Sequence, residues 1–219
     1  MNDPLLRAAT ADDGAELARI YAPVVALTAI SFELEPPDAT AMAERVRAAQ
    51  PRWPWIVACD AHDPGALLGY ASAGVFRARP AYRFACESAI YVDPNARRQG
   101  LGRRLYGALL GSLRRQGLHR VVAGISLPNP ASVALHEGLG FTPAGVVERV
   151  GFKFDRWHDM GFWTLNLAPD LERPRDEPRS TGDVDADGGE AARREADGRR
   201  TLQTDGPWRP QAGPGHEPA

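Results

Sequence analysis

The sequence has few of the residues that mark secreted, zinc-binding or membrane proteins. Only two cysteines, Cys59 and Cys86, occur among the 219 residues, and no Cys-x-x-Cys motif is present, so neither a disulfide framework nor a cysteine zinc site is supported. No apolar run reaches the roughly 18 residues that a membrane-spanning helix needs, and the acidic N-terminal stretch lacks the apolar segment of a signal peptide. We therefore expect a cytoplasmic protein with no membrane partner.

An excess of charge of one sign is also missing. The 26 basic side chains nearly balance the 28 acidic ones, whereas nucleic-acid-binding domains usually carry a basic surface. Lys153 is the only lysine beside 25 arginines, a bias typical of GC-rich genomes from which we infer no function. Without a Gly-x-Ser-x-Gly elbow a serine hydrolase is disfavoured. We expect no nucleic acid, and no metal, because ligand spacing is absent among His62, His119, His136 and His158.

Large apolar side chains nearly disappear in the last quarter of the chain. Residues 168–219 contain 12 acidic and 8 basic residues, 7 prolines and 7 glycines, but only four large apolar side chains. Such a segment cannot bury enough surface to offset about 1 to 2 kcal/mol of backbone entropy per residue. We therefore predict one compact domain over residues 1–167 and a disordered tail over residues 168–219.

Hydrophobic periodicity divides the domain into strands and helices. One helix is expected to begin at residues 10–13, and Asn129 with Pro130 is expected to begin another that ends at Gly138 and Gly140. Two more helices are predicted over 38–49 and 103–116. Strands are predicted over 5–9, 55–60, 66–76, 86–94 and 119–126, with two more within 141–167 that turn near 155–157. The pattern predicts a single mixed α/β sheet domain.

The most informative stretch follows Val92, where a loop with the sequence Arg-Arg-Gln-Gly-Leu-Gly leads directly into a helix. Free N–H groups at a helix start, opened by glycines, form a cradle for an anion, and Arg97, Arg98 and Arg103 add positive charge. A Walker loop would need Gly-Lys-Ser/Thr, and a dinucleotide fingerprint would need a third glycine where Leu105 stands. Both patterns fail. A lone Gly-x-Gly is usually only a turn, but Arg-x-x-Gly-x-Gly between a strand and a helix is a narrower pattern.

Arg-x-x-Gly-x-Gly between a strand and a helix resembles the pyrophosphate loop of acetyl-CoA-dependent N-acetyltransferases of the GNAT superfamily. Four further stretches resemble its phosphinothricin and methionine sulfoximine acetyltransferase branch: WPWIVA (53–58), RARPAYRFACESAIYV (77–92), LPNPASVALHEGLGF (127–141) and FKFDRWHDMGFW (152–163). The resemblance implies the GNAT fold, a mixed and mostly antiparallel sheet that is splayed in the middle and flanked by helices. It also implies a homodimer, and acetyl-CoA with its pantetheine arm in the splay.

The cofactor residues implied by the resemblance lie on a strand edge, in the glycine loop and at two helix starts. A helix cap explains Asn129 nearly as well as contact with the cofactor. The set comprises Ile90, Tyr91, Val92, Arg97, Arg98, Gln99, Gly100, Leu101, Gly102, Arg103 and Asn129.

Glu87 is the candidate general base. If Cys86 and Ser88 lie on one strand face, Glu87 shares the other with Ala89 and Tyr91, as a buried carboxylate in apolar surroundings with a raised pKa. An amine with a pKa of about 9 to 10 is mostly protonated near neutral pH, so its attack needs such a base. A structural edge residue or ion-pair partner is the alternative; the resemblance implies a glutamate that acts directly or through water.

The resemblance implies an acceptor side that includes Phe32 and His158. Arginine forks on the preceding loop either hold an anionic group or lie in solvent; the loop candidates are Arg77, Arg79 and Tyr82. His136 is the candidate proton donor to the leaving thiolate or else a partly buried polar residue, and Tyr106 is a weaker candidate. The chain departs from the branch at Glu33, Pro80 and the Arg83-Phe84 pair, which puts phosphinothricin itself in doubt.

These features lead to one main hypothesis and two alternatives. The main hypothesis is an acetyltransferase that passes an acetyl group from acetyl-CoA to the primary amine of a small amino-acid-like molecule by direct attack. A module that senses acyl-CoA without turnover would share the fold but would not need Glu87. A protein N-terminal acetyltransferase would need an open groove, whereas the bulky stretches RARPAYRF and WHD favour a closed pocket.

Overall fold

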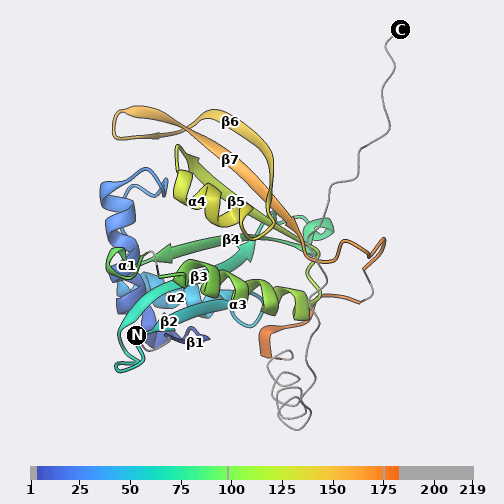
Figure 1. Cartoon of the computed structure of the whole chain (residues 1–219), viewed down its shortest axis with the longest axis horizontal. Helices are drawn as coiled ribbons and strands as arrows, with labels where there is room; N and C mark the ends of the chain where they lie inside the picture. The colour runs from blue at the N-terminus through green and yellow to red at the C-terminus, as the bar shows by residue number, and fades with distance from the viewer. Residues whose placement is uncertain (1–3, 98, 175, 183–219) are drawn as a thin grey trace. The chain divides into compact units, whose positions relative to one another are not determined.

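The computed structural model describes residues 4–97, 99–174 and 176–182. Over these residues the chain forms a seven-stranded sheet in the order β1-β2-β3-β4-β5-β7-β6 (Figure 1). All neighbouring strands are antiparallel except β4 and β5, which confirms the expected mixed sheet. The strands are β1 Leu5–Ala8, β2 Trp55–Cys59, β3 Leu67–Val75, β4 Ala85–Val92, β5 Arg120–Leu127, β6 Thr142–Lys153 and β7 Arg156–Asn166.

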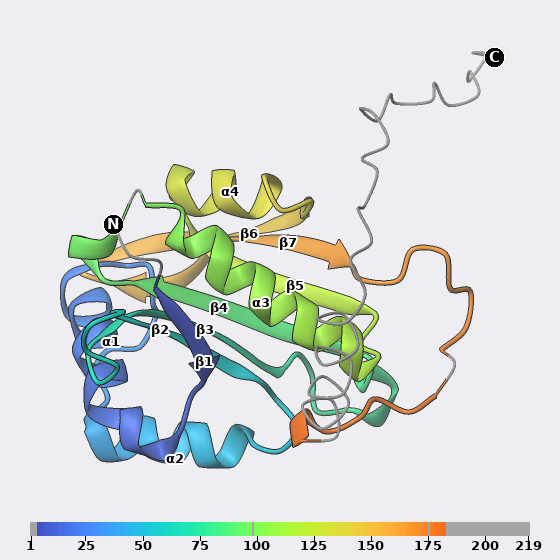
Figure 2. The same cartoon turned by 60° about the horizontal axis from the view of Figure 1, so that its bottom comes forward.

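Four helices cover the two faces of the sheet within the described part of the chain: α1 Gly14–Leu27, α2 Ala39–Ala49, α3 Leu101–Gln116 and α4 Pro130–Glu137 (Figure 2). One core packs Leu17 of α1 and Met42 of α2 against Tyr70 of the sheet. On the other face, Leu105 of α3 packs in a second core with Val121 of β5. Side chains of β2 and β3 alternate between the two cores, as the strand period requires.

The expected helix starts are largely confirmed. Asp38 Oδ1 accepts a bond from the Ala41 N–H at 2.7 Å, and Asn129 Oδ1 accepts one from the Ser132 N–H at 3.2 Å. Most strand boundaries differ from prediction by one or two residues, and two differences affect the site and the hairpin. α3 begins at Leu101 rather than residue 103, because Gly100, with a left-handed φ of 73°, is the N-cap of the helix. The last hairpin turns at Phe154 and Asp155, both with positive φ, so Arg156 and Trp157 already belong to β7.

The sheet opens in its middle. β4 pairs with β5 only from Ala85 to Ser88, opposite residues Arg120 to Ala123. Beyond that point β4 stays paired with β3 as far as Val92, and β5 stays paired with β7 as far as Leu127. The two strands therefore separate while each keeps its other neighbour, which confirms the splay implied by the resemblance.

The described start of the predicted tail is hydrogen-bonded to the domain. The Arg179 N–H donates to the Gln116 carbonyl at 2.8 Å, and the Thr181 N–H donates to the Pro51 carbonyl at 2.7 Å. Pro178, directly before Arg179, is buried. This stretch therefore differs from the expected disordered tail, because backbone and side-chain bonds fix it to the end of α3 and to the turn after α2. The prediction for residues 183–219 lies outside the described residues.

Candidate active site

A narrow cleft lies where β4 and β5 separate. Its walls are the second half of β4, the facing half of β5 and one side of α4, and Ile30 closes it from the segment after α1. The lining residues are Ile30, Ser88, Ala89, Ile90, Tyr91, Gly124, Ile125, Ser126, Asn129, Ser132 and His136. The structure thus brings together four residues that were predicted for the site from separate motifs: Ile90, Tyr91, Asn129 and His136.

The edge of β4 that faces this cleft has no strand partner beyond Ser88. Ile90, Tyr91 and Val92 bond with β3 on their other side, so their remaining backbone groups point toward the gap. Unpaired backbone N–H and C=O groups need partners. An extended chain with amide groups can pair with this edge, as an added strand does.

The glycine loop ends at the start of α3. Gly100 adopts a left-handed conformation that suits glycine and supplies no side-chain cap. The first N–H groups of a helix have no partner within it, and the helix dipole makes this end attractive to anions. Leu101 is buried in the core, so it can offer a ligand only its main chain. Arg97, Gln99 and Arg103 are exposed, and Arg98 lies outside the described residues.

Glu87 lies on the face of β4 that the strand alternation predicts. Ser88 turns toward Tyr106 of α3, whereas Tyr91, on the face that Glu87 shares, packs against Tyr21 of α1 with ring centroids 4.7 Å apart. The expectation of a buried carboxylate is wrong, because the Glu87 side chain is exposed. Two nearby glycines explain this. Gly74 is paired with Glu87 on β3, and Gly124 lies two residues beyond Val122, the β5 partner of Glu87; a Cβ at Gly124 would lie 3.5 Å from Glu87 Oε1.

Partial desolvation still raises the pKa of the Glu87 carboxyl, and the positive charge of Arg77 opposes that rise. A carboxylate with a raised pKa is a stronger base than an ordinary surface glutamate. The site therefore combines solvent access for an incoming amine with a carboxylate suited to take its proton.

A hydrogen-bonded chain lies on the opposite side of β4. The Tyr106 hydroxyl lies 2.6 Å from Ser88 Oγ and 3.0 Å from His136 Nε2. His136 Nδ1 lies 2.7 Å from the Ser132 carbonyl, which assigns the proton to Nδ1 and makes Nε2 the acceptor of the Tyr106 proton. Burial lowers the pKa of His136, so the imidazole is neutral at pH 7. The two candidate proton donors, His136 and Tyr106, are therefore parts of one chain.

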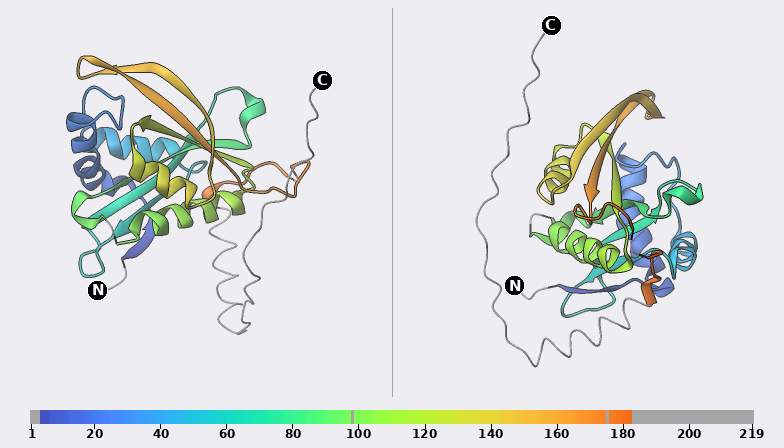
Figure 3. Two further views of the ribbon diagram at one scale, coloured as in Figure 1. Left: turned by 45° about the horizontal axis from the view of Figure 1, so that its top comes forward. Right: turned by 90° about the vertical axis from the view of Figure 1, so that its right-hand side faces the viewer.

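The predicted acceptor residues fall into two groups. Phe32 and His158 meet near the tip of the β6–β7 hairpin with ring centroids 6.1 Å apart. The guanidinium carbon of Arg77 lies 4.6 Å from the centroid of the Phe76 ring, and the Tyr82 ring packs edge-on against the same ring. Arg79 is exposed beside them. Figures 1 and 3 show the loop between β3 and β4 at one end of the molecule and the hairpin tip at the other, so the structure does not unite these two groups.

Among the cleft residues that the sequence analysis missed, two have a clear role. Ser88 joins the Tyr106 chain, and Gly124 keeps the space beside Glu87 open. A glycine within a strand often marks a close approach of another group, so Gly124 carried a usable signal. Ser88 carried none beyond its position next to Glu87.

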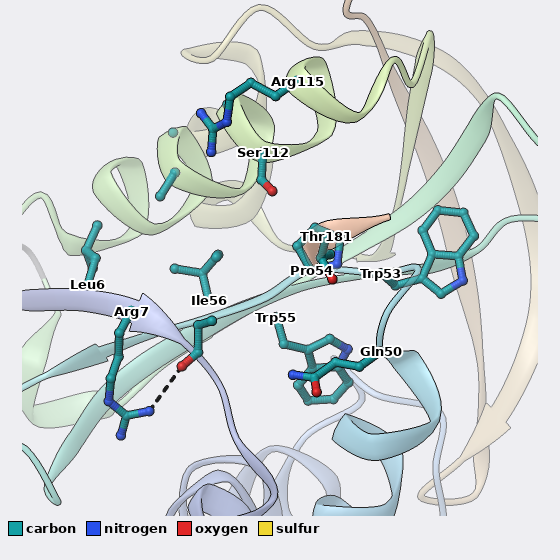
Figure 4. Close-up of a pocket in the computed structure, with 14 residues that line it drawn as sticks. Leu6, Arg7, Gln50, Trp53, Pro54, Trp55, Ile56, Ser112, Arg115 and Thr181 are labelled. Carbon is teal, nitrogen blue, oxygen red and sulfur yellow. Dashed lines mark hydrogen bonds between the residues drawn. The ribbon is translucent and has the colours of Figure 1, made fainter. Parts of the chain in front are cut away.

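A larger hollow of about 550 Å³ lies between β1, β2 and α3 (Figure 4). Leu6 and Ile56 contribute apolar surface. Space remains between them and α3 because Gly107 and Gly111 of that helix have no side chains. Arg7 at its edge is already paired with Asp13 at 2.6 Å. No predicted site residue lines this hollow, and we do not assign the active site to it.

The described ranges contain neither a metal-binding cluster nor a membrane-spanning helix. Within residues 4–97, 99–174 and 176–182, no group of three or more His, Cys, Asp and Glu side chains is placed to hold a metal ion. In the same ranges no helix has both the length and the apolar character needed to cross a bilayer.

Comparison with known proteins agrees with this geometry. The phosphinothricin N-acetyltransferase of Streptomyces viridochromogenes is 40% identical over 170 residues, which cover 77% of this chain and 91% of that protein. The L-methionine sulfoximine/L-methionine sulfone acetyltransferase of Pseudomonas aeruginosa is 44% identical over 126 residues, 58% of this chain and 72% of the relative.

A solved structure is also similar. It is a GNAT superfamily phosphinothricin acetyltransferase from Sinorhizobium meliloti in complex with AcCoA, with a TM-score of 0.75 and 35% identity over 81% of this chain and 96% of that one. Residues 24–141 match the Acetyltransferase (GNAT) family. The chain therefore belongs to the GNAT family of acetyltransferases.

Proposed function

We propose that this protein transfers an acetyl group from acetyl-CoA to the primary amine of a small amino-acid-like acceptor of the phosphinothricin, methionine sulfoximine or methionine sulfone type. The observation that carries the proposal is the position of Glu87, an accessible carboxylate beside the gap between β4 and β5. The relatives named above act on acceptors of this type by their descriptions. The residues that match the family, 24–141, include every residue that lines the cleft.

Glu87 serves as the general base, directly or through one water. It takes a proton from the acceptor ammonium, and the neutral nitrogen then forms a bond to the thioester carbonyl carbon. When the C–S bond breaks, the nitrogen gives up its remaining surplus proton and the leaving sulfur gains one, so that the neutral amide and the coenzyme A thiol form. The Ser88 hydroxyl lines the cleft and is placed to hydrogen-bond to the leaving thiolate. Tyr106 and His136 orient that hydroxyl, because Tyr106 donates to His136 Nε2.

The remaining predicted residues bind the donor. N–H groups at the start of α3 bind the pyrophosphate, assisted by Arg97 and Arg103. The free edge of Ile90 to Val92 binds the pantetheine amides. The free, buried cysteines Cys59 and Cys86 support our placement of the protein in the reducing cytoplasm.

A panel of amines tests the proposed function. Release of the coenzyme A thiol is measured with phosphinothricin, L-methionine sulfoximine, L-methionine sulfone and a short peptide with a free N-terminus. We expect turnover with at least one amino-acid-like amine and the N-acetyl product by mass spectrometry. Binding of acetyl-CoA without turnover on any amine would instead favour a sensor, and a preference for the peptide would favour a protein N-terminal acetyltransferase.

The pH dependence of kcat/KM should follow Glu87, because kcat/KM reports the pKa of the free enzyme. The rate rises with pH as Glu87 loses its proton, and Arg77 lowers the pKa of that group. Arg77→Gln should therefore raise the Glu87 pKa and move the acid limb of the profile to higher pH. Arg79→Gln, the same change two residues along the loop, should leave the midpoint in place. An unmoved limb in Arg77→Gln would contradict the assignment.

The homodimer is also part of our proposal. The β6–β7 hairpin exposes six large apolar side chains, each with 47% to 55% of its surface accessible: Val146, Val147, Val150, Phe152, Phe154 and Trp157. An apolar strip of this kind on a single chain is typical of an interaction surface. Its length along one hairpin suits the same hairpin of a second copy.

Two charges on this strip should separate the copies. Val146→Glu with Val147→Glu is expected to convert a dimer to a monomer in sedimentation velocity, because each carboxylate would be buried without a partner and the like charges would repel. Val75→Glu, at an equally exposed valine on β3, serves as the control and should remain dimeric. A wild-type protein that sediments as a monomer at every concentration would rule out the dimer.

A further inference from the structure

Lys153, at the end of β6, is an unusual buried charge. Only 5% of its surface is accessible. Its ammonium donates to the carbonyl oxygens of Val25 at 2.6 Å, Ser31 at 2.8 Å and Glu33 at 2.7 Å. All three donors of the ammonium are therefore used. No function was inferred for this lysine from the sequence.

The three carbonyls belong to a single stretch of chain more than a hundred residues away. Val25 lies in the last turn of α1, where the helix dipole favours a positive charge. Ser31 and Glu33 lie in the segment that leaves this helix. The Lys153 side chain thus fixes the path of residues 28–33, although it lies 120 or more residues further along the chain.

Within the described residues, no carboxylate accepts a hydrogen bond from the Lys153 ammonium. The Glu33 carboxylate bonds to Arg45 at 2.9 Å and to the Tyr21 hydroxyl at 3.0 Å, so Lys153 is held by main-chain oxygens. A compact ammonium directs three donors to separate oxygens, whereas a guanidinium is a planar fork that suits carboxylates. The geometry therefore requires lysine in a chain that otherwise uses arginine.

The segment fixed in this way forms the acceptor-side wall of the cleft. Ile30 lines the cleft together with Ala89 and Tyr91 of β4. Phe32 lies directly against the backbone of Gly151, because a Cβ at that glycine would clash with the Phe32 ring. His158, the other predicted acceptor residue at this end, is bonded through Nε2 to the Lys153 carbonyl at 3.0 Å.

We propose that Lys153 is a positioning residue for the acceptor, one that sets affinity and selectivity for the amine by holding Ile30 and Phe32 in place. It does not contact the reacting atoms, and it leaves the donor site at the start of α3 unaffected. The inference rests on the proposed function, because it assigns residues 28–33 to the acceptor pocket.

Steady-state kinetics of Lys153→Met, Lys153→Gln and Lys153→Arg test the inference with the acceptor that the wild-type protein uses best. We expect KM for the acceptor to rise about tenfold or more while KM for acetyl-CoA stays within about twofold. Arginine should not restore the acceptor KM, because its fork cannot replace three separate bonds. Restoration by arginine would show that charge alone matters and would overturn the proposal.

Two further variants keep the test decisive. Arg45→Met breaks the exposed ion pair to Glu33 on the same segment and should change the acceptor KM little. Ile30→Ala, at a side chain that is 43% exposed, should fold and should also raise the acceptor KM alone. An unchanged acceptor KM in Ile30→Ala overturns the proposal even where a Lys153 variant does not fold. Wild-type protein that acetylates no amine would instead count against the proposed function itself.

Discussion

Glu87→Gln is expected to lower kcat by about a hundredfold, because a positioned general base contributes about 10² to 10⁴ to such a transfer. The amide has the shape of the carboxylate but cannot take the proton of the acceptor ammonium. The donor site at the start of α3 lies beyond the other end of β4. Binding of acetyl-CoA should therefore stay unchanged in a calorimetric titration.

The same substitution should not reduce stability at neutral pH. The raised pKa of Glu87 means that the folded protein holds this proton more tightly than the unfolded chain does. The carboxyl group therefore stabilises the fold at low pH, and that contribution is lost as pH rises through its folded pKa. Glutamine avoids the ionised form, so Tm at neutral pH should hold or rise.

A matched control separates the catalytic effect from a general one. Glu44→Gln makes the same change at an exposed position on α2 and should leave kcat unchanged. A Glu87→Gln protein that turns over at the wild-type rate would remove Glu87 from the mechanism.

Gly124→Val should abolish most of the activity by filling the cleft rather than by removing a reacting group. A Cβ at this position would lie 3.3 Å from Met160 Sδ and 3.5 Å from Glu87 Oε1, and the two methyl groups of valine extend further. Valine suits a strand, and no left-handed φ is required at Gly124. We expect a loss of kcat/KM of about a hundredfold, because small displacements of reacting groups have effects of that size.

The control for this prediction is the same change on the neighbouring strand. Gly74 pairs with Glu87 from the β3 side, and no atom lies within 4 Å of a Cβ there. Gly74→Val should therefore keep much more activity than Gly124→Val, at similar Tm for both. Equal activity in the two variants would show that Gly124 does not border the reaction space.

Local chemistry explains what the sequence could predict. The helix cap at Asn129, the period-2 pattern of the strands and the glycine loop before α3 are all encoded within a few residues, and the structure confirms each of them. The face of β4 that carries Glu87 also follows from alternation alone. The splay came only from the resemblance, since the pairing of β4 with β5 depends on register between distant strands.

The features that the sequence analysis missed or predicted wrongly depend on contacts between residues that are distant in sequence. Glu87 is exposed because Gly74, its partner on β3, and Gly124, close to its carboxylate on β5, have no side chains, and neither glycine is near it in sequence. The bond between Tyr106 and His136 joins residues 30 positions apart, and the bonds of Lys153 span 120 to 128 positions. Contacts of this kind follow from the tertiary fold, which no local pattern specifies.

The most direct test of the account is a crystal structure of Glu87→Gln with acetyl-CoA and L-methionine sulfone, in which slow turnover preserves the ternary complex. We expect the pantetheine between Ile90 and Ile125, and the acceptor nitrogen within hydrogen-bond distance of the side chain at position 87, directly or through one water. A thioester outside the gap between β4 and β5, or an acceptor nitrogen on the α3 side of the sheet, would contradict the account.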